Sequence, residues 1–141
     1  MQDVHPRGAP STVNPSETTR TSLQPVLLLD AIGSGGSAVF LLAATGWLSL
    51  HLGLSTSLLR GAAVILIPFV VVLLVAVLAG ARSRPLIGAI VAFNVLWIVA
   101  SLGLLLFGGA SPTALGVSVV LVQAAMVAVV AWLQYAGITR D

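Results

Sequence analysis

The chain has 141 residues, of which 58% are hydrophobic and 7% are charged, whereas soluble domains carry about 25% charged residues. A soluble fold of this composition would expose a large apolar surface, so the sequence favours a protein that is embedded in a lipid bilayer. The sequence has no cysteine, which excludes disulfides, thiol chemistry and Cys-ligated metals, and its net charge of +2 is too small to indicate a nucleic-acid partner.

The first segment, residues 1–24, is rich in Pro, Ser and Thr and lacks an apolar periodicity. We therefore predict a flexible cytoplasmic tail over these residues. The apolar stretch that follows is longer than the core of about 7–15 residues found in signal peptides, and it contains Asp30, so we do not expect it to be cleaved. Residues 25–141 are predicted to form one transmembrane domain.

Four apolar segments follow the tail, over residues 26–50, 58–79, 86–108 and 113–136. Each has the roughly 20 residues that a helix needs to cross about 30 Å of hydrocarbon. Helices are required because lipid offers no hydrogen-bond partner to an open backbone. The links between the segments are short, which predicts two antiparallel helical hairpins. The expected fold is an all-α bundle of four transmembrane helices.

The arginines predict the orientation of this bundle. One side has only Arg60, and the other side collects Arg7, Arg20, Arg82, Arg84 and Arg140. Because cytoplasmic loops carry an excess of basic residues, both termini and the charged turn at Arg82 and Arg84 are predicted to be cytoplasmic. The expected location is the inner (plasma) membrane of the cell.

Asp30 is the only acidic residue within the predicted membrane segments. It lies about one turn inside the cytoplasmic end of the first helix, and two interpretations are open. An ionisable side chain at membrane depth indicates a functional site, here for a proton or a cation. Alternatively, Asp30 is a helix-start acid that is stabilised by the helix dipole and paired with an arginine of the cytoplasmic side. We favour the second interpretation as the commoner outcome for a terminal charge.

Small residues are concentrated just after Asp30, at Gly33, Gly35, Gly36 and Ser37. Asp30, Gly33 and Ser37 are expected to share one helical face. Gly33 with Ser37 forms a pair of small residues four positions apart, which lets two helices approach closely in lipid. We predict that these glycines serve helix packing; the alternative is a locally opened helix that lines a ligand cavity.

Polar residues also recur along single faces of the third and fourth helices. Asn94, Trp97 and Ser101 share a face of the third helix, and Gln123 and Gln134 are separated by three turns of the fourth. From their depth in the membrane, we predict a hydrogen bond between Ser37 and Asn94 and a contact between Asp30 and Gln134.

The second helix carries Arg60 at its outer start and Pro68 in its interior, and its other residues are almost all apolar. We expect Pro68 to kink this helix, because proline has no N–H to donate. We also predict that this helix is the most exposed to lipid of the four.

Enzyme chemistry has no support in the sequence. There is no phosphate-binding loop or metal-ligand cluster, and no nucleophile has a visible base partner. We therefore expect no catalytic residue, no metal and no cofactor.

Four groups of residues carry a resemblance to known proteins. They are Asp30-Ala31, Leu59-Arg60-Gly61, Asn94 with Trp97 and Ser101, and Gln123-Ala124 with Leu133-Gln134-Tyr135-Ala136-Gly137. This pattern resembles a group of small, uncharacterised bacterial membrane proteins with four helices. More loosely, the Leu-Gly-Leu link and the Leu-Arg-Gly start resemble the DoxX-like class. The resemblance implies a four-helix bundle and carries over no activity.

Three functions are compatible with these features. The first is a non-catalytic accessory or structural subunit of a membrane complex, or a small membrane protein that self-associates; its partners would be lipids and another membrane protein or a second copy. The alternative is a small oligomeric transporter or channel that uses Asp30, Asn94 and Gln123. The third is a protein that binds a lipid or a quinone in a cavity that Trp97 or Asn94 touches.

Overall fold

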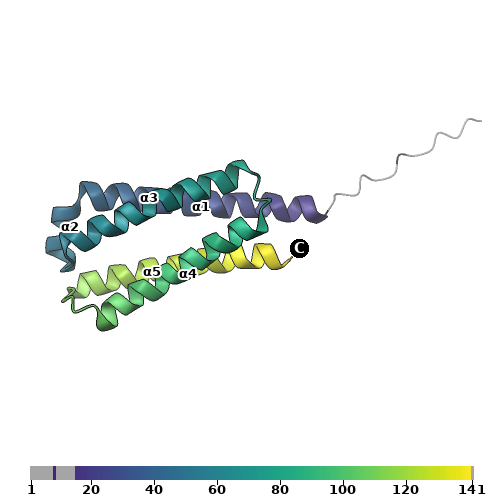
Figure 1. The fold of residues 1–141 in the computed structure, drawn as a ribbon. Helices are drawn as coiled ribbons and strands as arrows, with labels where there is room; N and C mark the ends of the chain where they lie inside the picture. Colours follow the sequence, from purple (N-terminus) through teal and green to yellow (C-terminus); the bar gives the residue numbers. More distant parts are fainter. Residues whose placement is uncertain (1–7, 9–14, 141) are drawn as a thin grey trace, which may run out of the picture.

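The computed structural model of the chain describes residue 8 and residues 15–140, and it describes side chains from Leu23 to Arg140. The described residues form helices and no strand, which confirms the predicted all-α class (Figure 1). The helices are α1 (Pro15–Ala43), α2 (Thr45–Leu52), α3 (Thr56–Leu78), α4 (Arg84–Phe107) and α5 (Ala114–Thr139).

The first predicted helix differs from the structure at both ends. Helix α1 begins at Pro15, so residues 15–24 are helical rather than part of a flexible tail; residues 1–7 and 9–14 of that predicted tail lie outside the described residues. The predicted helix over 26–50 is interrupted at Ala44, where φ is −110° and ψ is 18°. The hydroxyl of the next residue, Thr45, donates to the carbonyls of Leu41 and Leu42. A bond of this kind often accompanies a bend in a helix.

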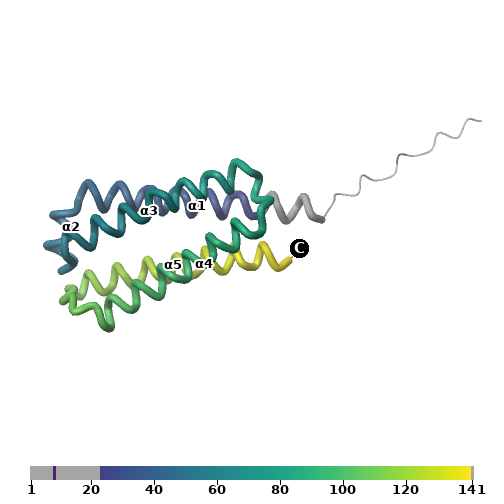
Figure 2. The backbone as a smooth tube through the Cα atoms, in the orientation of Figure 1, coloured from purple at the N-terminus to yellow at the C-terminus, as the bar shows by residue number. Residues whose placement is uncertain are grey.

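The long helices form two closely packed pairs, α1 with α3 and α4 with α5. Figure 2 shows these pairs as two layers that run along each other. Helix α5 also contacts α1, and α3 contacts α4, so α1 and α4 lie on one diagonal of the bundle. The main apolar core lies among α1, α3 and α4, and includes Leu27, Leu66, Leu73, Ile87 and Ile90.

At one end of the bundle, α2 is joined to the start of α5. The backbone N–H of Thr113 donates to the carbonyl of Leu52 at 3.0 Å, and its hydroxyl donates to the carbonyl of His51 at 2.6 Å. The same hydroxyl caps α5 by accepting from the N–H of Gly116 at 3.0 Å. A Cβ at Gly116 would collide with the carbonyl oxygen of Leu52. This join therefore depends on a residue without a side chain at position 116.

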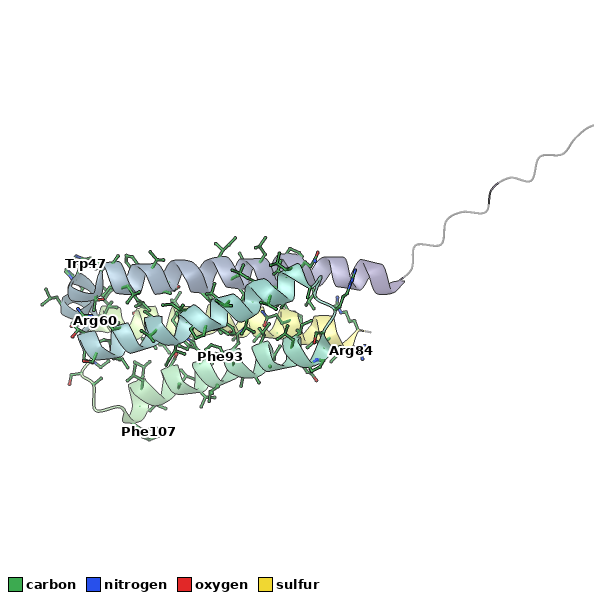
Figure 3. The ribbon with its side chains drawn as sticks, turned by 45° about the horizontal axis from the view of Figure 1, so that its top comes forward. Trp47, Arg60, Arg84, Phe93 and Phe107 are labelled. Atoms are coloured by element: carbon green, nitrogen blue, oxygen red, sulfur yellow. The ribbon has the colours of Figure 1, made fainter. Side chains whose placement is uncertain are left out.

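The other end holds the predicted charged turn between α3 and α4. Gly80 and Ala81 have φ values of 69° and 53°, and this left-handed pair reverses the chain after α3. Ser83 then caps α4 by accepting from the N–H of Leu86 at 3.4 Å, and Pro85 lies in the first turn, where a missing N–H costs no hydrogen bond. Figure 3 places Arg84 at this end, and places Arg60 with Trp47 and Phe107 at the opposite end.

Among the described residues, four helices are long and apolar enough to cross a membrane. Their spans are Leu23–Ala43, Thr56–Leu78, Arg84–Phe107 and Ala114–Thr139. These features fit a multi-pass integral membrane protein.

The expectation that the second predicted helix, α3 in the structure, is the most exposed to lipid is wrong. In the most apolar stretch of α3, 28% of the residues are buried inside the bundle. In the corresponding stretch of α4, only 11% are buried. The reason is that α3 packs along α1 with a regular stripe of core residues, unbroken at Pro68.

Candidate functional site

Polar side chains from α1, α4 and α5 meet in the interior of the bundle. Four of them, which we call the Asp30 cluster, are Asp30, Ser34, Asn94 and Gln134. The carboxylate oxygen Oδ2 of Asp30 accepts from Nδ2 of Asn94 at 2.9 Å and from Nε2 of Gln134 at 2.7 Å. Its other oxygen, Oδ1, accepts from the hydroxyl of Ser34 at 3.2 Å. The network is closed by Nδ2 of Asn94, which also donates to Oε1 of Gln134 at 3.1 Å.

The Asp30 cluster is deeply buried. The exposed fraction is 7% for Asp30, 3% for Asn94 and 0% for Gln134, whereas Ser34 is half-buried. Since α1 and α4 lie on the diagonal of the bundle, the bond from Asn94 to Asp30 crosses its centre. A hydrogen bond of this kind contributes about 0.6–2 kcal/mol in membrane proteins. The cluster therefore stabilises the packing of the α4–α5 pair on α1.

Local helix geometry explains how the sequence assembles this cluster. Ser34 follows Asp30 by four residues, so both side chains lie on the same face of α1. Gln134 reaches Asp30 because α5 packs beside α1, and Asn94 reaches both of them because α4 packs beside α5. The contact between Asp30 and Gln134 that was predicted from membrane depth is thus confirmed.

A second polar group, which we call the Gln123 cluster, joins α4 to α5 further along the bundle. The indole N–H of Trp97 donates to Oε1 of Gln123 at 3.1 Å. Nε2 of Gln123 donates to the hydroxyl of Ser101 at 3.0 Å, and that hydroxyl donates to the backbone carbonyl of Trp97 at 2.8 Å. The residues predicted to share a face of α4 thus all bond to α5, and Trp97 has the partner that its N–H requires.

Aromatic rings connect the Gln123 cluster to α3. The rings of Phe69 and Phe93 are stacked with their centroids 4.0 Å apart, and Phe93 lies 6.1 Å from the ring of Trp97. Figure 3 shows Phe93 near the middle of the bundle's length, well away from Phe107 at its end. Sequence reasoning missed both phenylalanines, although their apolar rings at mid-membrane could have indicated an aromatic contact between the helices.

The predicted hydrogen bond between Ser37 and Asn94 is wrong, because Ser37 is exposed on the outer surface of α1. Ser34, which was not predicted, occupies the interior position instead. Gly33 and Gly36 are also exposed, and no atom of another helix lies within 4 Å of a Cβ built there. Gly35 alone of the three glycines approaches another helix, with Val70 of α3 3.7 Å from such a Cβ.

The surface of α5 carries a shallow apolar groove of about 280 Å³. It is lined by Ser118, Val119, Val122, Gln123 and Met126. Gln123 therefore borders this groove while its amide group is bonded to α4. Within residues 23–140, every buried side-chain nitrogen or oxygen has a hydrogen-bond partner, and no group of three His, Cys, Asp or Glu residues could hold a metal ion.

Comparison of the chain with protein families, curated proteins and solved structures gives no match. The resemblance to small bacterial four-helix proteins and to the DoxX-like class therefore stays a prediction.

We expect a mutation in the Gln123 cluster to lower the unfolding free energy only modestly and to affect only the surroundings of Trp97. Gln123→Leu removes the acceptor of the Trp97 indole and leaves that donor unpaired, so we expect a loss of about 1 kcal/mol in unfolding free energy. In a background with Trp47→Phe and Trp132→Phe, the fluorescence of Trp97 should also shift. Val122→Leu, at an exposed neighbouring position, is the control and should change neither quantity. An unchanged Trp97 spectrum in Gln123→Leu would contradict the assigned bond.

Proposed function

We propose that this integral membrane protein is a non-catalytic accessory or structural subunit of a membrane complex, or a small membrane protein that self-associates. The observation that carries the proposal is the closure of both polar clusters. The amides, hydroxyls and indole that could have bound a ligand in the membrane are bonded to each other across α1, α4 and α5. Their chemistry is thereby used to hold the bundle together.

The outer surface of α1 supports the same proposal. Gly33, Gly36 and Ser37 are exposed within the membrane span, and the two glycines have no neighbouring helix within reach of a Cβ. In lipid, exposed small residues allow the backbone of another helix to approach closely. In a protein whose interior is already packed, this strip of α1 is available to a helix of a partner or of a second copy.

Cross-linking in native membranes tests this proposal. We expect the full chain to be captured with a second copy or with another membrane protein, and Gly36→Leu to reduce that capture at least about tenfold, because the bulky side chain holds the partner helix away. Gly61→Leu is the matched control, since Gly61 is also exposed without a neighbour but lies on α3. Recovery of the wild-type chain as a lone monomer in mild detergent and in membranes would contradict the proposal.

A small oligomeric transporter or channel is the second candidate. The observation in its favour is that Asp30, an ionisable residue within a membrane span, is buried toward the bundle interior and not toward lipid headgroups. A single transport pathway through Asp30, Asn94 and Gln123 is not favoured, because Asn94 belongs to the Asp30 cluster whereas Gln123 belongs to the Gln123 cluster. This candidate requires Asp30→Asn to abolish an ion flux across vesicles while expression stays normal, and an absence of flux in wild-type vesicles would remove it.

A further inference from the structure

We propose that one end of the bundle is a binding site for phospholipid headgroups, in which the guanidinium group of Arg60 pairs with a lipid phosphate and the exposed face of α2 lies against the glycerol region. We call it the α2 end. It consists of α2, the starts of α3 and α5 and the end of α4 (Figure 1). The inference does not depend on the accessory role proposed above, because it concerns lipid and not a protein partner.

Arg60 has no opposite charge beside it in the α2 end. It is exposed, and it is the only charged residue between Asp30 and Arg82. Residues 107–116, which supply the rest of this end, contain no charged residue. The negative charge that balances Arg60 therefore has to come from outside this end of the bundle.

The position of Arg60 brings its side chain to the level of lipid phosphates. Arg60 is the fifth residue of α3, about 6 Å along the axis from the first, and α3 begins at the edge of its membrane span. Helical side chains tilt toward the helix N-terminus, and long basic side chains near a span end extend out of the hydrocarbon. Both effects direct the guanidinium group to the interface, where arginine binds a phosphate through two parallel hydrogen bonds.

The exposed face of α2 has the composition of an interfacial surface. The α1 span ends at Ala43, and α2 begins two residues later. On α2, Leu50 is 82% exposed and Trp47 is 55% exposed. The ring of Trp47 is stacked on that of His51 with centroids 4.2 Å apart, and Nδ1 of His51 lies 2.8 Å from the carbonyl oxygen of Trp47. Trp47 is thereby held just past a span end, the level at which amphipathic rings are enriched in membrane proteins.

The combination of one cation with exposed apolar side chains favours a phospholipid as the occupant. Phe107, at the same end as Arg60 and Trp47 in Figure 3, is 87% exposed. In a phospholipid the phosphate lies next to the first methylene groups of the acyl chains. Lipid at this level therefore satisfies Arg60 and also covers Leu50 and Phe107, which would lose free energy if they faced water.

A single lysine tests the phosphate contact. The chain contains no lysine, so Arg60→Lys places one ¹⁵N-labelled ammonium group at this position, and lysine also binds phosphate. The full chain is reconstituted in phosphatidylcholine vesicles in a phosphate-free buffer, where lipid is the only source of ³¹P. We expect solid-state NMR to show dephasing of the lysine Nζ signal by ³¹P. A lysine signal that ³¹P does not dephase overturns the proposal.

The native arginine is tested in the same vesicles with ¹³C-labelled arginine. All six basic residues are arginines, and Arg60→Gln removes one of them. We expect the part of the arginine Cζ signal that ³¹P dephases to fall by about one-sixth or more. If the dephased part equals that of the wild type, Arg60 does not contact phosphate and the proposal is refuted.

A photo-cross-linker tests whether α2 and Arg60 belong to one site. With benzoylphenylalanine in place of Leu50, irradiation in vesicles of phosphatidylcholine and phosphatidylglycerol should give phospholipid adducts. We expect the anionic lipid to be enriched about fivefold among them, and Arg60→Gln to abolish this enrichment. Arg82→Gln, at the opposite end of the bundle, is the control and should retain it. Adducts to protein alone, or equal enrichment in Arg60→Gln and wild type, would overturn the proposal.

Discussion

Gly116→Ala is expected to destabilise the bundle by about 3 kcal/mol, although it adds only one methyl group. The new Cβ would collide with the carbonyl oxygen of Leu52, which belongs to the backbone and cannot rotate away. Helix α5 would have to separate from α2, and the two bonds from Thr113 would be lost with it. The measurement is the unfolding free energy from titration of micelle-bound protein with SDS.

Two other glycines provide controls for this prediction. Gly61→Ala meets no neighbour and should be neutral or stabilising by up to about 1 kcal/mol, since alanine is the better helix former. Gly137→Ala would meet Cδ1 of Leu23 at 2.5 Å, but that flexible side chain can move, so the loss should be intermediate. Equal stability of the Gly116→Ala and Gly61→Ala variants would contradict the close approach of α2 and α5.

The second large effect is expected at Asp30. In Asp30→Leu the amides of Asn94 and Gln134 lose their shared acceptor and face an apolar side chain at the bundle centre. Each unpaired buried donor costs about 1–3 kcal/mol, but interhelical hydrogen bonds in membranes contribute about 0.6–1.7 kcal/mol. We expect a total loss of about 2–4 kcal/mol in the same SDS titration.

Asp30→Asn is the matched control for this substitution. Its carbonyl oxygen can accept from both amides in place of Oδ2, and its NH₂ group can donate to the Ser34 hydroxyl. The expected loss is therefore below about 1 kcal/mol. If Asp30→Leu proves as stable as Asp30→Asn, the Asp30 cluster does not stabilise the bundle in the way that its geometry indicates.

Most of the helical architecture could be predicted from the sequence, because segments of about 20 apolar residues determine it. The interruption at Ala44 could not, because neither Ala44 nor Thr45 is a strong helix breaker and the interruption is seen only in the backbone angles of Ala44. Lipid exposure was also assigned to the wrong helix. The composition of α3 is almost wholly apolar, and composition alone does not show which apolar residues contact another helix and which contact lipid.

The error at Ser37 has a geometric cause. The prediction places Asp30, Gly33 and Ser37 on one face, but the buried face of α1 is centred on Leu27, Ala31 and Ala38, with Asp30 at its edge. At about 100° per residue, Ser34 lies about 40° from Asp30 toward the buried face, and Ser37 lies about 20° toward lipid. The pairing of Asp30 with Gln134 survived this error because both residues lie at similar depth.

The separation of the Asp30 partners along the chain also constrains the order of biosynthesis. Asp30 enters the bilayer with the first span, whereas Gln134 is 104 residues later and belongs to the last. A chain that lacks its final span would lack the Gln134 partner of this carboxyl group, and a chain that also lacks the third span would lack Asn94 as well. The Asp30 cluster is therefore complete only when all four spans are present.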